Sequence, residues 1–428
     1  MRPLHIRNAR LIDPQGGAET EGGLLIEDGR IAAVGDVSAP SGAAVLDCDG
    51  KTLAPGIVDL GVYVGEPGAR HRESYRTAGQ AAAAGGVTTF VAMPSTEPPI
   101  DDPAMVQFVR RRAEEVCPVN VEVMGALTQG LTGERMSEMG FLRDAGAVAF
   151  TDGDRYVSDA GVLRRCLSYA DALGALVLHH PQEASLSQGV ATEGFFATKS
   201  GLPGVPALAE RIGLERDLAV AELTGARYHA HQLSTAAALE PLARAKAARP
   251  GVTASASIHH LTLNEIDIEP YRTFFKLSPP LRTEADRRAL AQAAAEGLID
   301  VICSGHLPQD EELKRVPFAA AAHGAVGLET LLPAAMQLVH GGVMDLPTLW
   351  ARLSLAPARL LGLPCGRLAE GAPADLVLFD PDAPFVLDRF KLRSRSKNTP
   401  YDGRTMQGRV LATFVGGERV EGAGAWAT

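Results

Sequence analysis

Histidine is the residue type whose spacing first suggests chemistry in this chain. The 428-residue sequence has 11 histidines, and seven of them stand at or just after the ends of short apolar runs. Because imidazole nitrogen is a preferred ligand of zinc, such groups brought together predict a metal site, present or ancestral. The seven are His179, His180, His229, His231, His259, His260 and His306, whereas His5, His71, His323 and His340 are interpreted as surface or packing residues.

The elements that would position these histidines lie between residues 55 and 365. Short apolar runs alternate there with helical stretches, which favours parallel strands joined by helices in an α/β fold. Eight strands over this length predict a (β/α)8 TIM-type barrel, whose chemistry lies at the carboxyl ends of the strands. A doubly wound sheet is the competing interpretation, but no G-x-G-x-x-G motif follows the first strand. The predicted strands are Ile57–Val64, Val87–Met93, Val119–Leu127, Ala147–Thr151, Ala175–His179, Arg227–His231, Val252–His259 and Asp300–Ser304.

The two chain ends have a different texture from the middle. Residues 1–54 and 366–428 contain short alternating runs broken by glycine, with Asp-Gly pairs at 28–29 and 49–50 that are typical of hairpins. We therefore expect one small β-sandwich domain built from both ends, flanking a barrel at 55–365.

Composition excludes several classes of protein. The formal net charge of −10 argues against nucleic acid or an anionic membrane as the main partner. No apolar run reaches the roughly 18 residues that cross a bilayer, and the first residues have no continuous apolar segment of a secretory signal. The five cysteines lack C-x-x-C spacing, which favours a reducing cytoplasm.

Several motifs resemble one known family over nearly the whole chain. They include "LAPGIVDLGVYVGEPG", "GGVTTFVAMPSTEPP", "HPQEASL", "HAHQLST", "SIHHLTL", "SPPLRTEADR", "ICSGHLP" and "SRSKNTPYDG". The sequence looks like the dihydroorotase branch of the amidohydrolase superfamily, and most like its longer members related to allantoinase and hydantoinase. The resemblance implies a metal-bound hydroxide that attacks a cyclic amide.

The first strand lacks the metal ligands and the substrate-binding arginine that the resemblance implies. The family's His-x-His ligand pair falls on Gly61 and Tyr63, and its substrate-binding arginine falls on Gly65. Glycine has no ligand atom, and tyrosine is not among the usual ligands of zinc. Two ligands and one substrate contact are therefore expected to be missing.

The other strand ends show further departures. The aspartate that acts as ligand and general base in the family corresponds to Gly305. The next residue, His306, is retained and is the remaining substrate-binding position that the resemblance implies. Two asparagines that contact substrate in the family correspond to Ser95 and Ser278. No catalytic residue can thus be assigned by resemblance.

Three ligand positions are retained: Asp152, His180 and His231. Two imidazoles and one carboxylate could in principle hold a single zinc ion, which leaves an active enzyme open as an alternative. The six losses instead favour a member without catalysis or cofactor. The resemblance then implies a structural subunit for the aspartate transcarbamoylase catalytic chain, itself a homo-oligomer, in pyrimidine biosynthesis.

Overall fold

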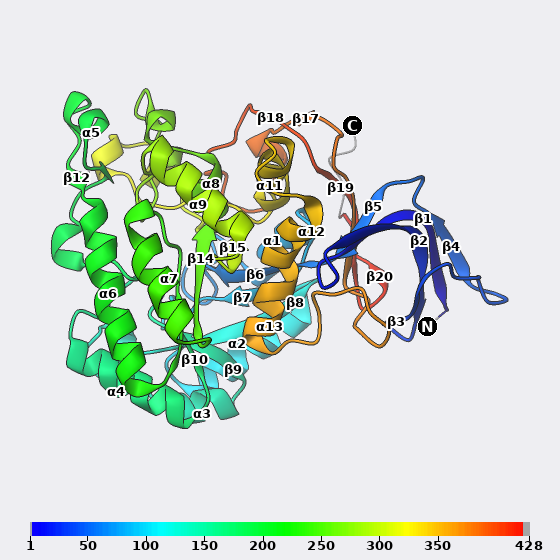
Figure 1. Ribbon diagram of the computed structural model, residues 1–428, viewed down its shortest axis with the longest axis horizontal. Coiled ribbons are helices and arrows are strands. Elements are labelled where there is room, and N and C mark those ends of the chain that lie inside the picture. Colours follow the sequence, from blue (N-terminus) through cyan, green and yellow to red (C-terminus); the bar gives the residue numbers. More distant parts are fainter. Residues whose placement is uncertain (1, 423–428) are drawn as a thin grey trace.

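The computed structural model describes residues 2–422, and its larger part is a barrel of eight parallel strands (Figure 1). Neighbouring strands are hydrogen-bonded in the order β15-β14-β13-β10-β9-β8-β7-β6. β15 also packs against β6, and the amide of Ser304 donates to Asp59 at 2.8 Å, so the sheet is nearly closed. The predicted α/β TIM-type fold is therefore confirmed. The strands are β6 (Ile57–Val62), β7 (Val87–Ala92), β8 (Asn120–Ala126), β9 (Ala147–Thr151), β10 (Leu176–His179), β13 (Arg227–Ala230), β14 (Val252–Ser257) and β15 (Val301–Cys303).

The interior of the barrel is a packed core and not a channel. Buried apolar side chains from most of the strands fill it, because parallel strands covered on both faces are rich in apolar residues. They are Leu60, Val91, Met93, Met124, Ala149, Leu176, Leu178 and Val301. Polar side chains such as Asp59, Thr89 and Ser255 are also buried within the strands.

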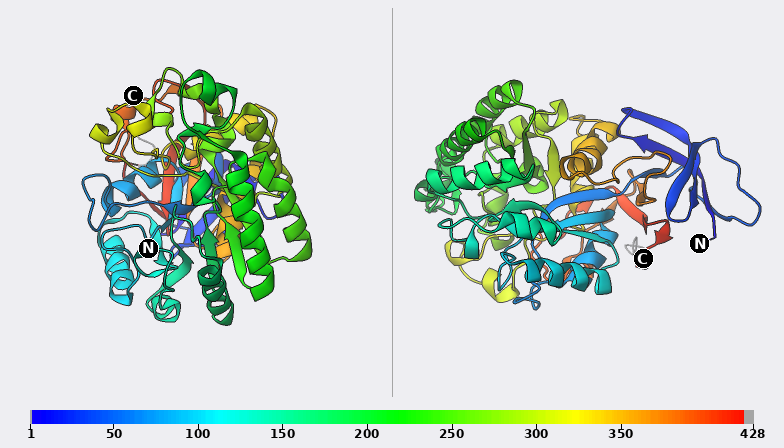
Figure 2. Two further views of the ribbon diagram at one scale, coloured as in Figure 1. Left: turned by 90° about the vertical axis from the view of Figure 1, so that its left-hand side faces the viewer. Right: turned by 90° about the horizontal axis from the view of Figure 1, so that it is seen from below.

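Helices cover the outside of the barrel (Figures 1 and 2). Their ends follow local capping rules: Asp102 caps α2 ahead of Pro103, and Thr283 with Asp286 forms a capping box on α9. The helices are α1 (Tyr75–Ala84), α2 (Pro103–Val116), α3 (Met139–Asp144), α4 (Ala160–Ala172), α5 (Phe195–Lys199), α6 (Ala207–Thr224), α7 (Leu239–Ala248), α8 (Ile258–Thr262), α9 (Glu284–Glu296), α10 (Glu311–Lys314), α11 (Leu331–His340), α12 (Leu346–Trp350) and α13 (Ala356–Leu361).

Both chain ends contribute to a second, mixed sheet beside the barrel, at the right of Figure 1. Its order is β20-β19-β16-β5-β1-β2-β3, with β4 paired to β1, and it has its own apolar core that includes Ile6, Leu24 and Phe414. The strands are β1 (Leu4–Asp13), β2 (Ala18–Glu27), β3 (Arg30–Gly35), β4 (Ala44–Asp47), β5 (Thr52–Pro55), β16 (Leu376–Asp380), β19 (Arg409–Val415) and β20 (Glu418–Arg419). Short pairs β11 (Ala191–Thr192) with β12 (Gly204–Val205) and β17 (Phe385–Val386) with β18 (Thr405–Met406) lie outside both sheets.

Six of the predicted barrel strands end one or two residues earlier than expected, and the difference matters most in the seventh. The seventh barrel strand, predicted to reach His259, stops at Ser257, and His259 and His260 belong to the short helix α8.

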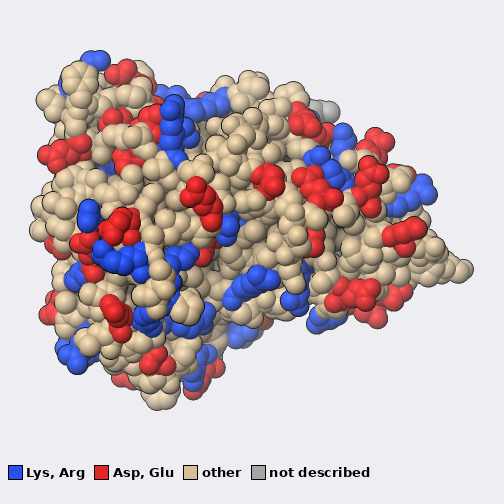
Figure 3. Space-filling view, in the orientation of Figure 1, with Lys and Arg blue, Asp and Glu red and all other residues tan. Residues whose placement is uncertain are grey.

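None of the helices within residues 2–422 is long and apolar enough to cross a membrane. Acidic and basic side chains are interspersed over the face shown in Figure 3.

Candidate functional site

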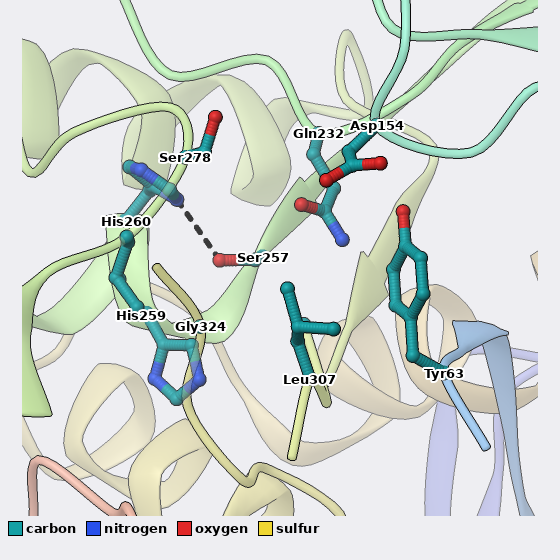
Figure 4. Close-up of a pocket in the computed structure, with 11 residues that line it drawn as sticks. Tyr63, Asp154, Gln232, Ser257, His259, His260, Ser278, Leu307 and Gly324 are labelled. Atoms are coloured by element: carbon teal, nitrogen blue, oxygen red, sulfur yellow. Dashed lines mark hydrogen bonds between the residues drawn. The ribbon is translucent and has the colours of Figure 1, made fainter. Parts of the chain in front are cut away.

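A small cavity lies at the carboxyl ends of the barrel strands, where a barrel enzyme keeps its chemistry (Figure 4). Its volume is about 20 Å³, which is close to what one water molecule needs. In this conformation the mouth therefore has no room for a cyclic amide. The lining residues are Tyr63, Asp154, Gln232, Ser257, His259, His260, Leu277, Ser278, Gly305, Leu307 and Gly324.

Gly61, the first expected ligand position, is filled by its neighbours. It has φ of +94°, and a β-carbon there would lie 2.7 Å from the methyl carbon of Met93 and 3.0 Å from Nε2 of His231. Real β-carbons essentially never approach so closely, so His231 and Met93 occupy the space that a side chain at residue 61 requires. The Nε2 atom of His231 is buried without a hydrogen-bond partner among the described residues.

Tyr63, the second expected ligand position, points its phenol ring toward Asp154 and Gln232 (Figure 4). Burial, aided by the charge of Asp154, raises the pKa of Tyr63 well above its ordinary value, so the phenol stays neutral. A β-carbon on Gly153 would lie 3.2 Å from the Tyr63 hydroxyl and 2.6 Å from Oγ of Ser95. The ring thus lines the cavity on the side of β6 and lies close to Gly153.

Gly305, the expected position of the general base, has φ of +62°. A β-carbon there would lie 3.0 Å from Cβ of Ser257 and 3.3 Å from the ring of His259. An aspartate at this position would need both a strained backbone and movement of these two neighbours.

His306 does not line the cavity. Its Nδ1 accepts hydrogen bonds from the amides of Gly327 and Leu328, and its Nε2 lies 3.6 Å from the buried carboxylate of Glu73. Burial alone would raise the pKa of Glu73, but hydrogen bonding and charge from His306 lower it overall. His306 therefore joins the end of β15 to the start of α1, and its predicted contact with substrate has no counterpart in this geometry.

The remaining substrate positions differ from one another. Gly65 has no space for a side chain, because its β-carbon would collide with the carbonyl of Ala69. Ser278 does line the cavity, on the side of His260 (Figure 4).

The three retained ligand positions lie at adjacent strand ends, but their hydrogen-bond partners differ, and Nε2 of His231 has none among the described residues. Asp152 accepts hydrogen bonds from the amides of Leu127 and Thr128 and from the Thr128 hydroxyl. The Nδ1 atom of His180 lies 3.3 Å from the carbonyl oxygen of His231. In residues 2–422 no three His, Cys, Asp or Glu side chains gather as a set that could hold a metal ion.

The chain's own residues thus do not fit the family's zinc site. Gly61 offers no donor atom, its space is filled, and Tyr63 is a neutral phenol.

The histidine pair on α8 is engaged in hydrogen bonds. Nδ1 of His260 lies 2.9 Å from the Ser257 hydroxyl, and Nε2 lies 3.1 Å from the carbonyl of Pro279. Nδ1 of His259 lies 3.3 Å from the Tyr401 hydroxyl. Burial lowers the pKa of His260 to about 4 and that of His259 to about 3, so both rings are neutral near pH 7.

Sequence reasoning missed one residue of the mouth. His323, interpreted as a surface or packing residue, places Nε2 3.0 Å from the Asp154 carboxylate at the edge of the cavity. Burial raises the pKa of Asp154, but hydrogen bonding and charge from His323, together with the charge of His180, lower it overall. The two residues are 169 positions apart in the chain and form no recognisable motif.

Comparison with known proteins agrees with this architecture. The family model described as dihydro-orotase-like matches residues 50–238. A dihydroorotase from Pelobacter propionicus is 40% identical over 97% of this chain and 99% of its own length. A dihydroorotase-like protein from Pseudomonas aeruginosa is 41% identical over 97% of this chain and 98% of its own.

The solved structure of an L-hydantoinase (dihydropyrimidinase) from Arthrobacter aurescens superimposes with a TM-score of 0.90 at 26% identity, covering 98% of this chain and 96% of that one. The fold and the site together define a barrel of the amidohydrolase kind. Within that class, the chain belongs to the dihydroorotase-like family.

Proposed function

We propose that this chain is a dihydroorotase-like protein that does not open dihydroorotate. The observation that carries the proposal is the packing at Gly61, where His231 and Met93 fill the space of the first metal ligand. The neutral Tyr63 at the second ligand position and Gly305 at the position of the base support it. A metal-bound hydroxide and a general base are the two parts that such hydrolysis requires.

A structural role follows from the resemblance drawn from the sequence. Degenerate members of this family hold aspartate transcarbamoylase chains in a mixed complex, and we propose the same partner here. On this proposal the chain works in the cytoplasm, as part of a homo-oligomeric core for that enzyme of pyrimidine biosynthesis.

The names of its relatives favour a second candidate. Relatives from Pelobacter propionicus and Pelotomaculum thermopropionicum are called dihydroorotase and are 40% and 41% identical to this chain over 97% of its length. An active cyclic amidohydrolase would have to use Asp152, His180 and His231 on one zinc ion and another group as base. It would also require the cavity at the mouth to open.

One experiment separates the two candidates. The purified full chain is analysed for metal content and assayed for ring opening of dihydroorotate, with a zinc-containing dihydroorotase measured in parallel. We expect a zinc content far below one equivalent and a rate at the background of the assay. About one equivalent of bound zinc together with an enzyme-like rate would establish the second candidate and exclude the first.

The structural role has its own test. The chain is co-expressed with the aspartate transcarbamoylase catalytic chain of the same organism, and the mixture is separated by size. A stable mixed complex with transcarbamoylase activity is expected. Separate elution of two fully active proteins would contradict the role, whatever the outcome of the zinc measurement.

A further inference from the structure

A second cavity, with a volume of about 350 Å³, lies where three separate segments meet. They are the short helix η5 (Thr273–Phe275) after β14, α10 after β15, and η8 (Arg389–Lys391) from the chain end. Four of the lining residues are basic: Arg272, Lys314, Arg315 and Arg389. In a chain with net charge −10, this local excess of positive charge needs a cause.

Two carboxylates also line the cavity, and each already has a partner. Glu311 lies 2.6 Å from Arg315, and Asp402 lies 3.5 Å from Arg389. When Lys314 is protonated, four basic groups and two carboxylates leave an excess of two positive charges.

The two basic residues without a carboxylate are Arg272 and Lys314. Within residues 2–422, no carboxylate oxygen lies within 4.0 Å of either side chain, although Arg272 stacks on the ring of Phe275 at 4.8 Å. Arg272 is exposed and therefore free to reach a ligand.

Lys314 is the unusual member of the cluster because its side chain is only 3% exposed. Its ammonium donates to the carbonyls of Ala322 at 2.6 Å, Thr273 at 3.2 Å and Lys276 at 3.5 Å. A buried charge without a counter-ion is costly, and burial, together with the charge of Lys276, lowers the pKa of Lys314 to about 7. An anion in the cavity would relieve that cost.

We propose that this cavity binds the phosphate group of a small phosphate-bearing ligand. Arginine offers paired N–H donors to phosphate oxygens and lysine offers a point charge, and an excess of two charges matches a phosphate dianion. The volume of the cavity lies in the range of small-molecule sites. The ring of Phe274, which also lines it and lies 5.2 Å from the guanidinium of Arg389, gives the rest of the ligand an apolar surface.

Binding there would connect three segments close to the barrel mouth. The carbonyls of Lys276 and Ala322 hold Lys314, and the nearby residues Leu277 and Gly324 line the mouth cavity. The ligand would fix these loops against the C-terminal segment, independently of whether the mouth performs catalysis.

The test is a calorimetric titration of the full chain with inorganic pyrophosphate at about 0.15 M ionic strength, with sodium chloride as the comparison at equal ionic strength. We expect saturable binding of pyrophosphate and none of chloride. Arg272→Gln should weaken it about ten-fold, because a charge-assisted hydrogen bond is lost. Arg164→Gln, which alters an exposed arginine on α4, should leave it unchanged.

Lys314→Met provides a second variant, provided that its circular dichroism spectrum matches that of the parent chain. It should weaken binding at least as much as Arg272→Gln, because Lys314 is the buried charge. If Lys314→Met does not fold, the Arg272 and Arg164 variants decide the question. No saturable binding of pyrophosphate, or equal affinity in those two variants, would overturn the proposal.

Discussion

The ring of His231 is packed so closely against Gly61 that a β-carbon on residue 61 would lie 3.0 Å from its Nε2 atom. His231, a retained ligand position, thus occupies the space that a side chain at residue 61, a lost ligand position, would need. Any side chain at residue 61 must displace His231 or Met93, so the present packing depends on the absence of the ligand that the family uses.

Replacement of Gly61 by alanine tests how tightly His231 and Met93 pack against residue 61. Overpacking of a core by one methyl group typically costs about 1–3 kcal/mol. Gly61→Ala should lose that amount of unfolding free energy beyond Gly35→Ala, whose φ of +105° is similar but whose β-carbon would meet nothing within 4 Å. Urea denaturation measures both, and equal losses would mean that the mouth is open at this point.

Restoring the expected base by Gly305→Asp should not restore chemistry. The φ of +62° strains any side chain, and the β-carbon would meet Ser257 at 3.0 Å. Relative to Gly201→Asp, which has φ of +63° and open space around it, we expect roughly 1–2 kcal/mol less unfolding free energy. Zinc content should stay unchanged, and tight binding of zinc by the Gly305 variant would refute this account of the site.

Sequence reasoning found the barrel because each strand is a short apolar run of the kind that two covered faces require. β9 has its predicted bounds, and the other strands differ by one or two residues at an end. It failed at His259 and His260, since an adjacent pair of histidines looks alike at the end of a strand and in a one-turn helix.

The candidate site was harder to predict than the fold. The resemblance located Gly61, Tyr63 and Gly305, but which neighbour fills an emptied space depends on distances that one sequence does not contain. His323 was missed for the same reason, because its contact with Asp154 is made by a loop far along the chain.

His179, which directly precedes the predicted metal ligand His180, has a structural role that can be tested. His179 lies 2.5 Å from the fully buried Asp217, whose other oxygen accepts from Arg216 at 2.6 Å. Nε2 of His179 accepts from the amide of Val157, so Nδ1 carries the proton and donates to Asp217. Although burial raises it, the pKa of Asp217 is lowered overall by His179 and Arg216.

Asp217→Asn should therefore cost about 3 kcal/mol of unfolding free energy, because the new NH2 group must face either His179 or Arg216, both of which donate. Asp144→Asn, on a side chain that is 71% exposed, should change it by less than about 0.5 kcal/mol. Similar denaturation midpoints for the two variants would show that this buried pair contributes little.

A buried carboxyl behind the mouth should make stability depend on pH. Glu329 accepts hydrogen bonds from the amides of Arg393 and Ser394, and burial raises its pKa to about 7 from 4.5. Because the folded state holds this proton more tightly than the unfolded state, the contribution of Glu329 to stability is fully present below pH 4.5 and is lost as pH rises to about 7. The loss attributable to Glu329 is at most about 3 kcal/mol.

Glu329→Gln keeps the shape of the side chain and removes the titration. Compared with the parent chain, the variant should gain stability at pH 8 relative to pH 5, as measured by urea midpoints at both pH values. Glu134→Gln, an exposed carboxyl with no resolved partner in the described chain, serves as the control and should follow the parent at both pH values. A constant difference between the Glu329 variant and the parent from pH 5 to pH 8 would mean that Glu329 is already ionised in the folded protein at pH 5, held by the two amides and by Lys397.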